Sequence, residues 1–301
     1  MTLPLADNKR QRLVAIALMI AAVTCFSFLD ATAKYLSLTL PSVEVVWARY
    51  FGAFLVAVAI SNPIAHPGLM HTTRPGLQIF RSALLVVSTL LGFTAIRYLQ
   101  LDEQVSILFT APFMVAALSG PILGERISWR RWLAIFAAFG GVLVVTRPFG
   151  DSIHPAALLT CCAAFFYAVY IIFTRILART DSNETTLFYS NIVGAAVMSV
   201  VVPFFWVTPD NLFTVFLMLV AGVFGSVGHY LLIIAHRYAP AAVLAPYIYA
   251  QLLSMTALGY LVFGHVPNRW TLLGAAIVVA SGLYLLSLDR RSVSSQISPR
   301  A

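Results

Sequence analysis

RYLQLDEQVSILFTAPFMVAALSGPILGER occupies residues 97–126, and RYAPAAVLAPYIYAQLLSMTALGYLVFGHV follows 140 positions later at residues 237–266. Apolar stretches resemble one another by chance, but both of these begin with Arg-Tyr and end at a glycine turn. Between residues 97 and 133 this register gives six identities, namely Arg97/Arg237, Tyr98/Tyr238, Ala117/Ala257, Leu118/Leu258, Gly124/Gly264 and Leu133/Leu273. We therefore predict a duplicated chain whose function lies between the two copies.

The composition places the chain in a membrane. Its 301 residues are 60% hydrophobic and 10% charged, and the mean hydropathy is +0.89, whereas soluble domains average about 45–50% apolar and about 25% charged residues. The 19 Lys and Arg outnumber the 11 Asp and Glu but are scattered, which favours orienting loops over nucleic-acid binding. The cysteines lie in apolar stretches and are expected to be buried thiols, not disulfides or metal ligands: Cys25, Cys161 and Cys162.

Ten apolar segments are long enough to cross a bilayer, which takes about 20 helical residues. Turn residues such as Pro41 and Pro209 separate them. Pro112 and Pro246 are expected to kink the fourth and ninth helices. The expected spans are 13–36, 43–61, 77–99, 103–123, 130–147, 155–178, 185–205, 212–235, 241–263 and 270–288.

The distribution of Lys and Arg orients these spans. With the N-terminus in the cytoplasm, fourteen lie on the inner side and four on the outer side, while Arg49 lies within a span. Each copy has five spans, so the second copy enters the membrane from the opposite face. We predict an all-α integral membrane protein of ten transmembrane helices in two inverted five-helix repeats. Its parts are a cytoplasmic N-terminal segment (1–12), a first repeat (13–147), a second repeat (155–288) and a disordered cytoplasmic tail (289–301).

Two motifs accompany this organisation. The turn Gly124-Glu125-Arg126 precedes a Trp-containing fifth helix, and Arg237-Tyr238-Ala239-Pro240-Ala241-Ala242-Val243 precedes the ninth. Together with the five-plus-five duplication, they resemble the EamA-type branch of the drug/metabolite transporter superfamily over residues 13–288, and within it the YddG-type exporters of aromatic amino acids. The resemblance implies a bacterial inner-membrane carrier that exports amino acids or other small metabolites. His265 stands where many members carry Glu, so no role of that acid transfers to this chain.

Charged residues inside the spans are candidates for function. Asp30 and Lys34 form either a local ion pair that reaches the outer interface or part of a site. Arg49 has no acid three or four residues away, so its partner must come from another helix. It either pairs with Asp30 as a structural element or binds a substrate carboxylate in the pathway. Arg81 is most simply an anchor near the cytoplasmic face.

Polar and aromatic side chains at similar depth complete the candidate substrate site. His229, Asn191, Tyr247 and Gln251 suit a zwitterionic or neutral substrate, although a hydrogen-bonded core histidine is the simpler interpretation of His229. Two aromatic stripes are either helix packing or the wall of a cavity for a partly apolar substrate. They are Trp47, Tyr50 and Phe54 on the second helix, and Tyr167, Tyr170 and Thr174 on the sixth.

The sequence lacks a phosphate-binding glycine loop, a nucleophile elbow, a His-Glu-x-x-His motif and a paired aspartate-rich motif, which disfavours an enzyme. We therefore expect a secondary transporter that exports small metabolites by alternating access, with amino acids carrying aromatic or apolar side chains as substrates. No cofactor, metal or nucleic acid is expected, and the partners are the substrate and membrane lipid around a monomer or homodimer. The alternatives are an intramembrane enzyme acting on a lipid-linked substrate, an exporter of other drugs or metabolites, and a scaffold without flux. Proton coupling and facilitated diffusion both remain open.

Overall fold

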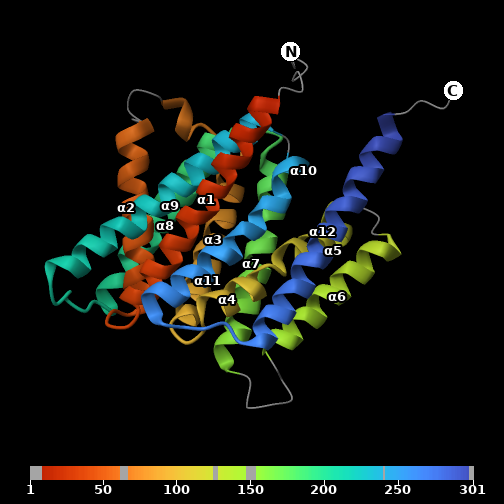
Figure 1. Ribbon diagram of the computed structural model, residues 1–301. Coiled ribbons are helices and arrows are strands. Elements are labelled where there is room, and N and C mark those ends of the chain that lie inside the picture. The colour runs from red at the N-terminus through yellow and green to blue at the C-terminus, as the bar shows by residue number, and fades with distance from the viewer. Residues whose placement is uncertain (1–8, 62–66, 125–127, 147–153, 240, 298–301) are drawn as a thin grey trace.

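The computed structural model describes residues 9–61, 67–124, 128–146, 154–239 and 241–297, and within them every regular element is a helix (Figure 1). The elements are α1 (Lys9–Leu36), α2 (Ser42–Ser61), η1 (Pro67–Met70), α3 (Pro75–Ile96), α4 (Leu101–Leu108), α5 (Ala111–Leu123), α6 (Trp129–Thr146), α7 (Pro155–Leu177), α8 (Asn183–Val201), η2 (Val202–Phe204), α9 (Leu212–Tyr238), α10 (Ala241–Leu244), η3 (Ala245–Tyr249), α11 (Ala250–Phe263) and α12 (Arg269–Ile297).

The described residues contain nine segments long and apolar enough to span a membrane, and the remaining expected span, the ninth in chain order, is interrupted. The interruption is η3, a 3-10 segment between α10 and α11 that contains Pro246. In the fourth span α4 ends at Leu108 and α5 begins at Ala111. Pro112 has no N–H to donate to the carbonyl of Leu108, which explains why the helix stops there. Both helix interruptions expected from proline are therefore confirmed, and in the fourth span the helix is interrupted just before Pro112.

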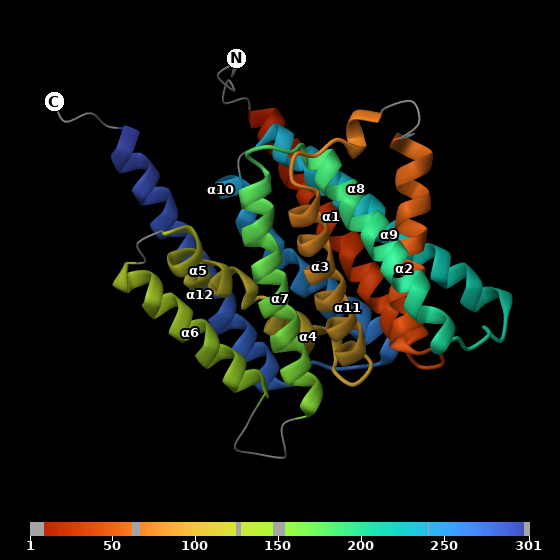
Figure 2. The ribbon, with the colours of Figure 1, turned by 180° about the vertical axis from the view of Figure 1, so that it is seen from behind.

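The two repeats have the same packing in opposite orientation. Figure 2 shows α1 starting at the face where α12 ends, whereas α7 starts at the opposite face. α1 packs on α9 as α7 packs on α3, and α2 packs on α9 as α8 packs on α3. The equivalent helices α2 and α8 contact each other, as do α6 and α12. This is the arrangement expected for a pseudo-twofold axis in the membrane plane.

The glycine turns repeat in backbone conformation as well as in sequence. Gly124 ends α5 with φ 72°, and Gly264 ends α11 with φ 68°. Both values lie in the left-handed region that only glycine adopts readily. The register of 140 residues is thus confirmed by structure at the turns on which it was based.

The breaks of the fourth and ninth spans meet at the pseudo-twofold axis. Phe109 lies at the first break and Tyr249 at the second, and the two positions are 140 residues apart. Their rings contact edge to face with centroids 5.0 Å apart. A residue can touch its own symmetry equivalent only beside the axis, so the interrupted helices face each other at the centre of the molecule.

A close contact between α2 and α9 joins the two repeats beside this centre. Gly52 and Gly222 face each other so closely that a Cβ added at Gly222 would lie 2.5 Å from the Cα of Gly52. Small residues allow such an approach between helices in a membrane. The backbone of the second span is therefore held directly against the second repeat.

The C-terminal tail differs from the sequence prediction. α12 continues as a helix to Ile297, past the expected boundary at 288. The prediction of disorder from 289 is wrong as far as Ile297, because residues 289–297 contain neither Gly nor Pro and polar composition alone does not end a helix. Residues 298–301 lie outside the described part of the chain, as do residues 1–8 of the expected N-terminal segment.

Candidate functional site

Arg49 lies in the membrane-spanning part of α2 and is half-buried. Its Nη1 donates a hydrogen bond to Oγ1 of Thr89 on α3 at 3.1 Å. The guanidinium also lies over the ring of Tyr50, 4.6 Å from its centroid, and 6.0 Å from that of Phe93. An arginine has five N–H donors, and this is the one hydrogen bond from its side chain to the described residues. Most of the guanidinium is thus available to a ligand.

Asp30 on α1 faces this guanidinium without binding it. The carboxylate and Arg49 interact electrostatically, but no ion pair within 4.0 Å joins them in the described chain. Asp30 also makes no hydrogen bond to another described residue. The ion pair that the sequence suggested between the two residues is therefore not formed, although they are close enough to interact electrostatically.

Aromatic side chains of α7 border the same space. Tyr167 and Tyr170 stack with centroids 5.6 Å apart and an interplanar angle of 25°. Tyr167 is 40% exposed in the middle of its helix, and it lies close enough to Arg49 for an electrostatic interaction. Tyr167 is thus a partly accessible side chain in the neighbourhood of a charged residue. The two tyrosines therefore lie in the neighbourhood of Arg49, as either of the two interpretations of this stripe requires.

His229 on α9 lies in the neighbourhood of two arginines. It interacts electrostatically with both Arg49 and Arg81. Its ring contacts Phe26 of α1 edge to face, with centroids 4.9 Å apart. Phe26 in turn lies over Gly228, where a Cβ would come within 2.7 Å of the phenyl ring. The imidazole is thus held by aromatic packing, and it makes no hydrogen bond to the described residues.

Arg81 does not serve as the interfacial anchor that its position near the start of the third span suggested. Its side chain is completely buried and joins α3 to α7 and α8. Nη1 donates to Oγ1 of Thr174 at 3.1 Å, and Nη2 donates to the carbonyl of Thr186 at 2.6 Å and to Oγ of Ser190. The guanidinium also lies 4.7 Å from the ring centroid of Tyr170. These contacts satisfy most of its N–H donors, and the guanidinium packs against the ring of Tyr170 on α7.

Lys34 also differs from the interpretation as a pair with Asp30 at the interface. The side chain is buried, and Nζ donates to the carbonyls of Ile96 at 2.8 Å and Leu99 at 2.6 Å. The last carbonyls of a helix have no partner within the helix and attract cations. Lys34 therefore closes the C-terminus of α3 and leaves Asp30 unpaired.

The other candidates from the second span lie at different places. Tyr50 is buried, with its hydroxyl 3.0 Å from Oγ1 of Thr89 and its ring in the notch left by Gly194 on α8. It orients Thr89 and packs under Arg49. Trp47 donates from Nε1 to Oγ of Ser199 at 3.0 Å and contacts the ring of Trp206. Trp47 therefore belongs to the interface of α2 and α8.

Three polar candidates have no recorded contact with Arg49. Asn191 is buried on α8 next to Ser190, the partner of Arg81. Tyr247 on η3 packs in an apolar cluster with residues of α1, α9 and α10. Gln251 is half-buried on α11, and its side chain makes no hydrogen bond within the described chain. Sequence reasoning missed Thr89 and Phe93, since a threonine and a phenylalanine in an apolar span carry no distinguishing signal.

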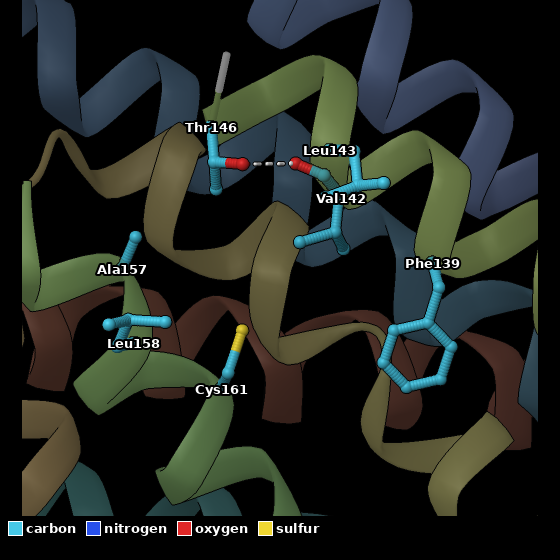
Figure 3. Close-up of a pocket in the computed structure, with 7 residues that line it drawn as sticks. All are labelled: Phe139, Val142, Leu143, Thr146, Ala157, Leu158 and Cys161. Carbon is cyan, nitrogen blue, oxygen red and sulfur yellow. Dashed lines mark hydrogen bonds between the residues drawn. The ribbon is translucent and has the colours of Figure 1, made fainter. Parts of the chain in front are cut away.

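An apolar groove lies between α6 and α7, outside the space around Arg49 (Figure 3). Its volume is about 230 Å³, and it is lined by Phe139, Val142, Leu143, Thr146, Ala157, Leu158 and Cys161. The hydroxyl of Thr146 is already bonded to the carbonyl of Val142 at 3.0 Å. The groove offers no charged group to a polar metabolite, so the site of interest is the group of polar and aromatic side chains around Arg49. Within the described chain no cluster of His, Cys, Asp and Glu could hold a metal ion.

Comparison with known families accounts for this architecture. A model of the EamA-like transporter family matches the chain twice, at residues 13–147 and 154–288. The chain belongs to the EamA-like transporter family. The two matches coincide with the two copies inferred from the glycine turns, and this EamA protein is a multi-pass membrane protein with two inverted repeats.

Named bacterial relatives of this EamA protein are transporters. It is 27% identical over 292 residues to the S-adenosylmethionine uptake transporter of Rickettsia prowazekii, which covers 96% of this chain and 98% of the relative. It is 28% identical over 277 residues to the riboflavin transporter of Vibrio cholerae, covering 91% and 93%. The pseudopaline exporter CntI of Pseudomonas aeruginosa is 26% identical over 275 residues, covering 90% and 95%.

A solved structure has the same fold, with a TM-score of 0.63 at 17% identity over 92% of this chain and 98% of its own. The family expectation is therefore confirmed, and transport is the common activity of the named relatives. None of the three relatives above is named as an exporter of aromatic amino acids, so the narrower subfamily expectation has no support from them.

Proposed function

We propose that this EamA protein is a secondary transporter for small zwitterionic metabolites that carry an α-amino-acid group and an aromatic or apolar portion. Aromatic amino acids, the substrates expected from the sequence, belong to this class. Transport proceeds by alternating access between the two inverted repeats, out of a bacterial cytoplasm that contains both chain termini.

The unpaired charges of Arg49 and Asp30 carry this proposal. The guanidinium has most of its N–H donors unused, and a carboxylate is the ligand that matches its planar fork. The carboxylate of Asp30 lies nearby without a partner, which suits the ammonium group of the same substrate. Two charged groups without partners are costly in a membrane, and a zwitterion satisfies both without adding net charge.

The aromatic wall accounts for the rest of the substrate. The stacked rings of Tyr167 and Tyr170 offer a flat surface beside Arg49, and planar groups stack favourably on such rings. Of two substrates named for relatives, S-adenosylmethionine fits both parts of this division, whereas riboflavin fits only the flat part. S-adenosylmethionine combines an amino-acid group with a purine, and riboflavin contains a planar ring system. The wall therefore supports a substrate with an aromatic or other flat apolar part.

Counterflow in proteoliposomes tests the proposal. Vesicles containing the purified protein are loaded with unlabelled phenylalanine, methionine, S-adenosylmethionine or riboflavin, and exchange for each labelled compound is measured. We expect exchange of compounds with an α-amino-acid group and a reduction of at least about tenfold in Arg49→Met, since a charge-assisted bond is worth about 1.5–3 kcal/mol. Arg269→Met is the matched control, because Arg269 is exposed and stacks on Trp270. Unchanged exchange by folded Arg49→Met protein would exclude this role of Arg49.

A further inference from the structure

An ion pair at one face of the second repeat connects the start of α8 to the end of α9. Arg237 donates from Nη2 to Oε1 of Glu184. Both side chains are accessible, at 64% and 46%. The pair lies at the face where α1 starts and α12 ends (Figure 1).

The first repeat has the same two residues in the same register. Glu44 and Arg97 lie 140 positions before Glu184 and Arg237, at the start of α2 and just after α3. The inverted arrangement places them at the opposite face of the molecule. The sequence thus provides each face with one potential ion pair between equivalent helices.

In the structure this second pair is not formed. Glu44 is completely buried, and its Oε2 accepts a hydrogen bond from the N–H of Val207 at 3.1 Å. Its other oxygen, Oε1, is buried without a partner. Arg97 is exposed and lies beside the ring of Tyr98. Glu44 therefore binds the connection after α8, which belongs to the other repeat, in place of Arg97.

The neighbourhoods of the two pairs are related by the pseudo-twofold axis. The η2 connection packs on α2, and the η1 connection packs on α8 in the equivalent way. Both faces therefore contain a Glu, an Arg and a connection from the other repeat. At one face Glu44 binds that connection, and at the other face Glu184 binds Arg237 of its own repeat. In an inverted-repeat carrier, the opposite state is reached when each repeat takes the conformation of the other.

We propose that Glu44–Arg97 and Glu184–Arg237 are reciprocal latches, of which one is closed in each state of the transport cycle. In the state seen here Glu184 holds Arg237, and Glu44 is held by Val207 across the repeats. In the opposite state Glu44 releases Val207 and binds Arg97, while Glu184 releases Arg237 and turns to the connection that contains η1.

The surroundings of the two carboxylates explain why this exchange is reversible. A buried carboxylate oxygen without a partner is unfavourable. In the opposite state Arg97 binds Glu44 and supplies this missing partner. The accessible pair of Arg237 and Glu184 is weak, because exposed ion pairs contribute little in water. Neither state is therefore held by a strong ion pair at these carboxylates, which suits a carrier that must visit both states.

Cross-linking tests the exclusion of one latch by the other. The three native cysteines are replaced by Ala, and Glu44→Cys, Arg97→Cys, Glu184→Cys and Arg237→Cys are introduced together in the full chain. A short bifunctional methanethiosulfonate is added in proteoliposomes, and the linked peptides are identified by mass spectrometry. We expect molecules linked at 44/97 or at 184/237 but not at both. Doubly linked molecules, or a pair 44/97 that never links, would overturn the proposal.

A second measurement avoids dependence on the fourfold variant. In protein with only Glu44→Cys and Arg97→Cys, adding Arg237→Gln opens the other latch and is expected to raise the linking yield about two- to fivefold. The control substitution Arg269→Gln is expected to leave the yield unchanged. An equal yield with Arg237→Gln and Arg269→Gln would contradict reciprocal latching.

The inference rests on the alternating-access part of the proposed function and on no particular substrate. Both cross-linking measurements are made without substrate. Exclusion of one link by the other therefore stands even if amino-acid exchange fails, and amino-acid exchange stands even if both links form together.

Discussion

Replacing Gly222 by Ala tests the close approach of the two repeats at α2 and α9. The new Cβ would lie 2.5 Å from the Cα and 2.7 Å from the carbonyl carbon of Gly52. These are backbone atoms that cannot rotate away, so the helices must separate by about 1 Å to restore van der Waals contact. Overpacking of this kind costs about 1–3 kcal/mol, whereas the better helix propensity of Ala returns about 0.5–1 kcal/mol. The difference between the two is a net loss of up to about 2.5 kcal/mol, and we expect a loss because the contact is between backbone atoms.

Gly225→Ala is the matched control on the same helix. Its Cβ would lie 3.7 Å from Leu29 and 3.9 Å from Nε of Arg49, which is ordinary contact. Thermal unfolding of both purified variants in the same detergent, followed by intrinsic fluorescence, provides the comparison. We expect Gly222→Ala to unfold a few degrees below the wild type and Gly225→Ala to unfold at or above it. Equal or higher stability of Gly222→Ala would refute the argument that the backbones touch.

Two further substitutions test polar contacts away from Arg49. Lys34→Met leaves the buried carbonyls of Ile96 and Leu99 without their donor. We expect the free energy of unfolding, measured by thermal or denaturant unfolding, to fall by about 1–3 kcal/mol. Lys34→Arg should recover part of this loss, and a Lys34→Met protein as stable as the wild type would contradict the capping role. Burial and the cation of Lys34 keep the pKa of His265 below its usual range, although Asp102 opposes this. The unfolded chain therefore binds this proton at a higher pH than the folded protein does. The free energy of unfolding keeps its full contribution from neutral His265 above about pH 6.5, and it falls as the pH drops below that value. The melting temperature of His265→Gln should depend less on pH between 7 and 5, and an unchanged pH dependence would contradict this assignment.

The sequence was sufficient for the parts of the fold that repeat. Gly124 and Gly264 share a register, a turn conformation and a place at the end of a helix, so a weak sequence identity still located the two copies. Pro112 and Pro246 marked the interrupted helices because a missing N–H acts locally. The proximity of Asp30 and Arg49 could also be predicted. Both lie within membrane spans, and Arg49 has no acid near it on its own helix, so a neighbouring acid had to come from another helix.

The contacts that could not be predicted depend on which helix faces which. Lys34 and Arg81 both lie near the ends of spans, where an interfacial anchor is the simplest interpretation of a cation. Lys34 instead binds the end of α3, and Arg81 joins α3 to α7 and α8. Spacing along one helix does not contain this information. Thr89, the hydroxyl that orients Arg49, could not be distinguished from other small polar residues for the same reason.

Ligand binding with paired substitutions tests the central claim that Arg49 and Asp30 hold the two ends of a zwitterion. Affinities of phenylalanine, phenethylamine and 3-phenylpropionate are measured by isothermal titration calorimetry for the wild type, Arg49→Met and Asp30→Asn. We predict that Arg49→Met removes the preference for phenylalanine over the amine that lacks a carboxylate, and that Asp30→Asn removes the preference over the acid that lacks an ammonium group. Equal weakening of all three ligands by both substitutions would contradict the account, because the two charges would then support the structure and not recognise the substrate.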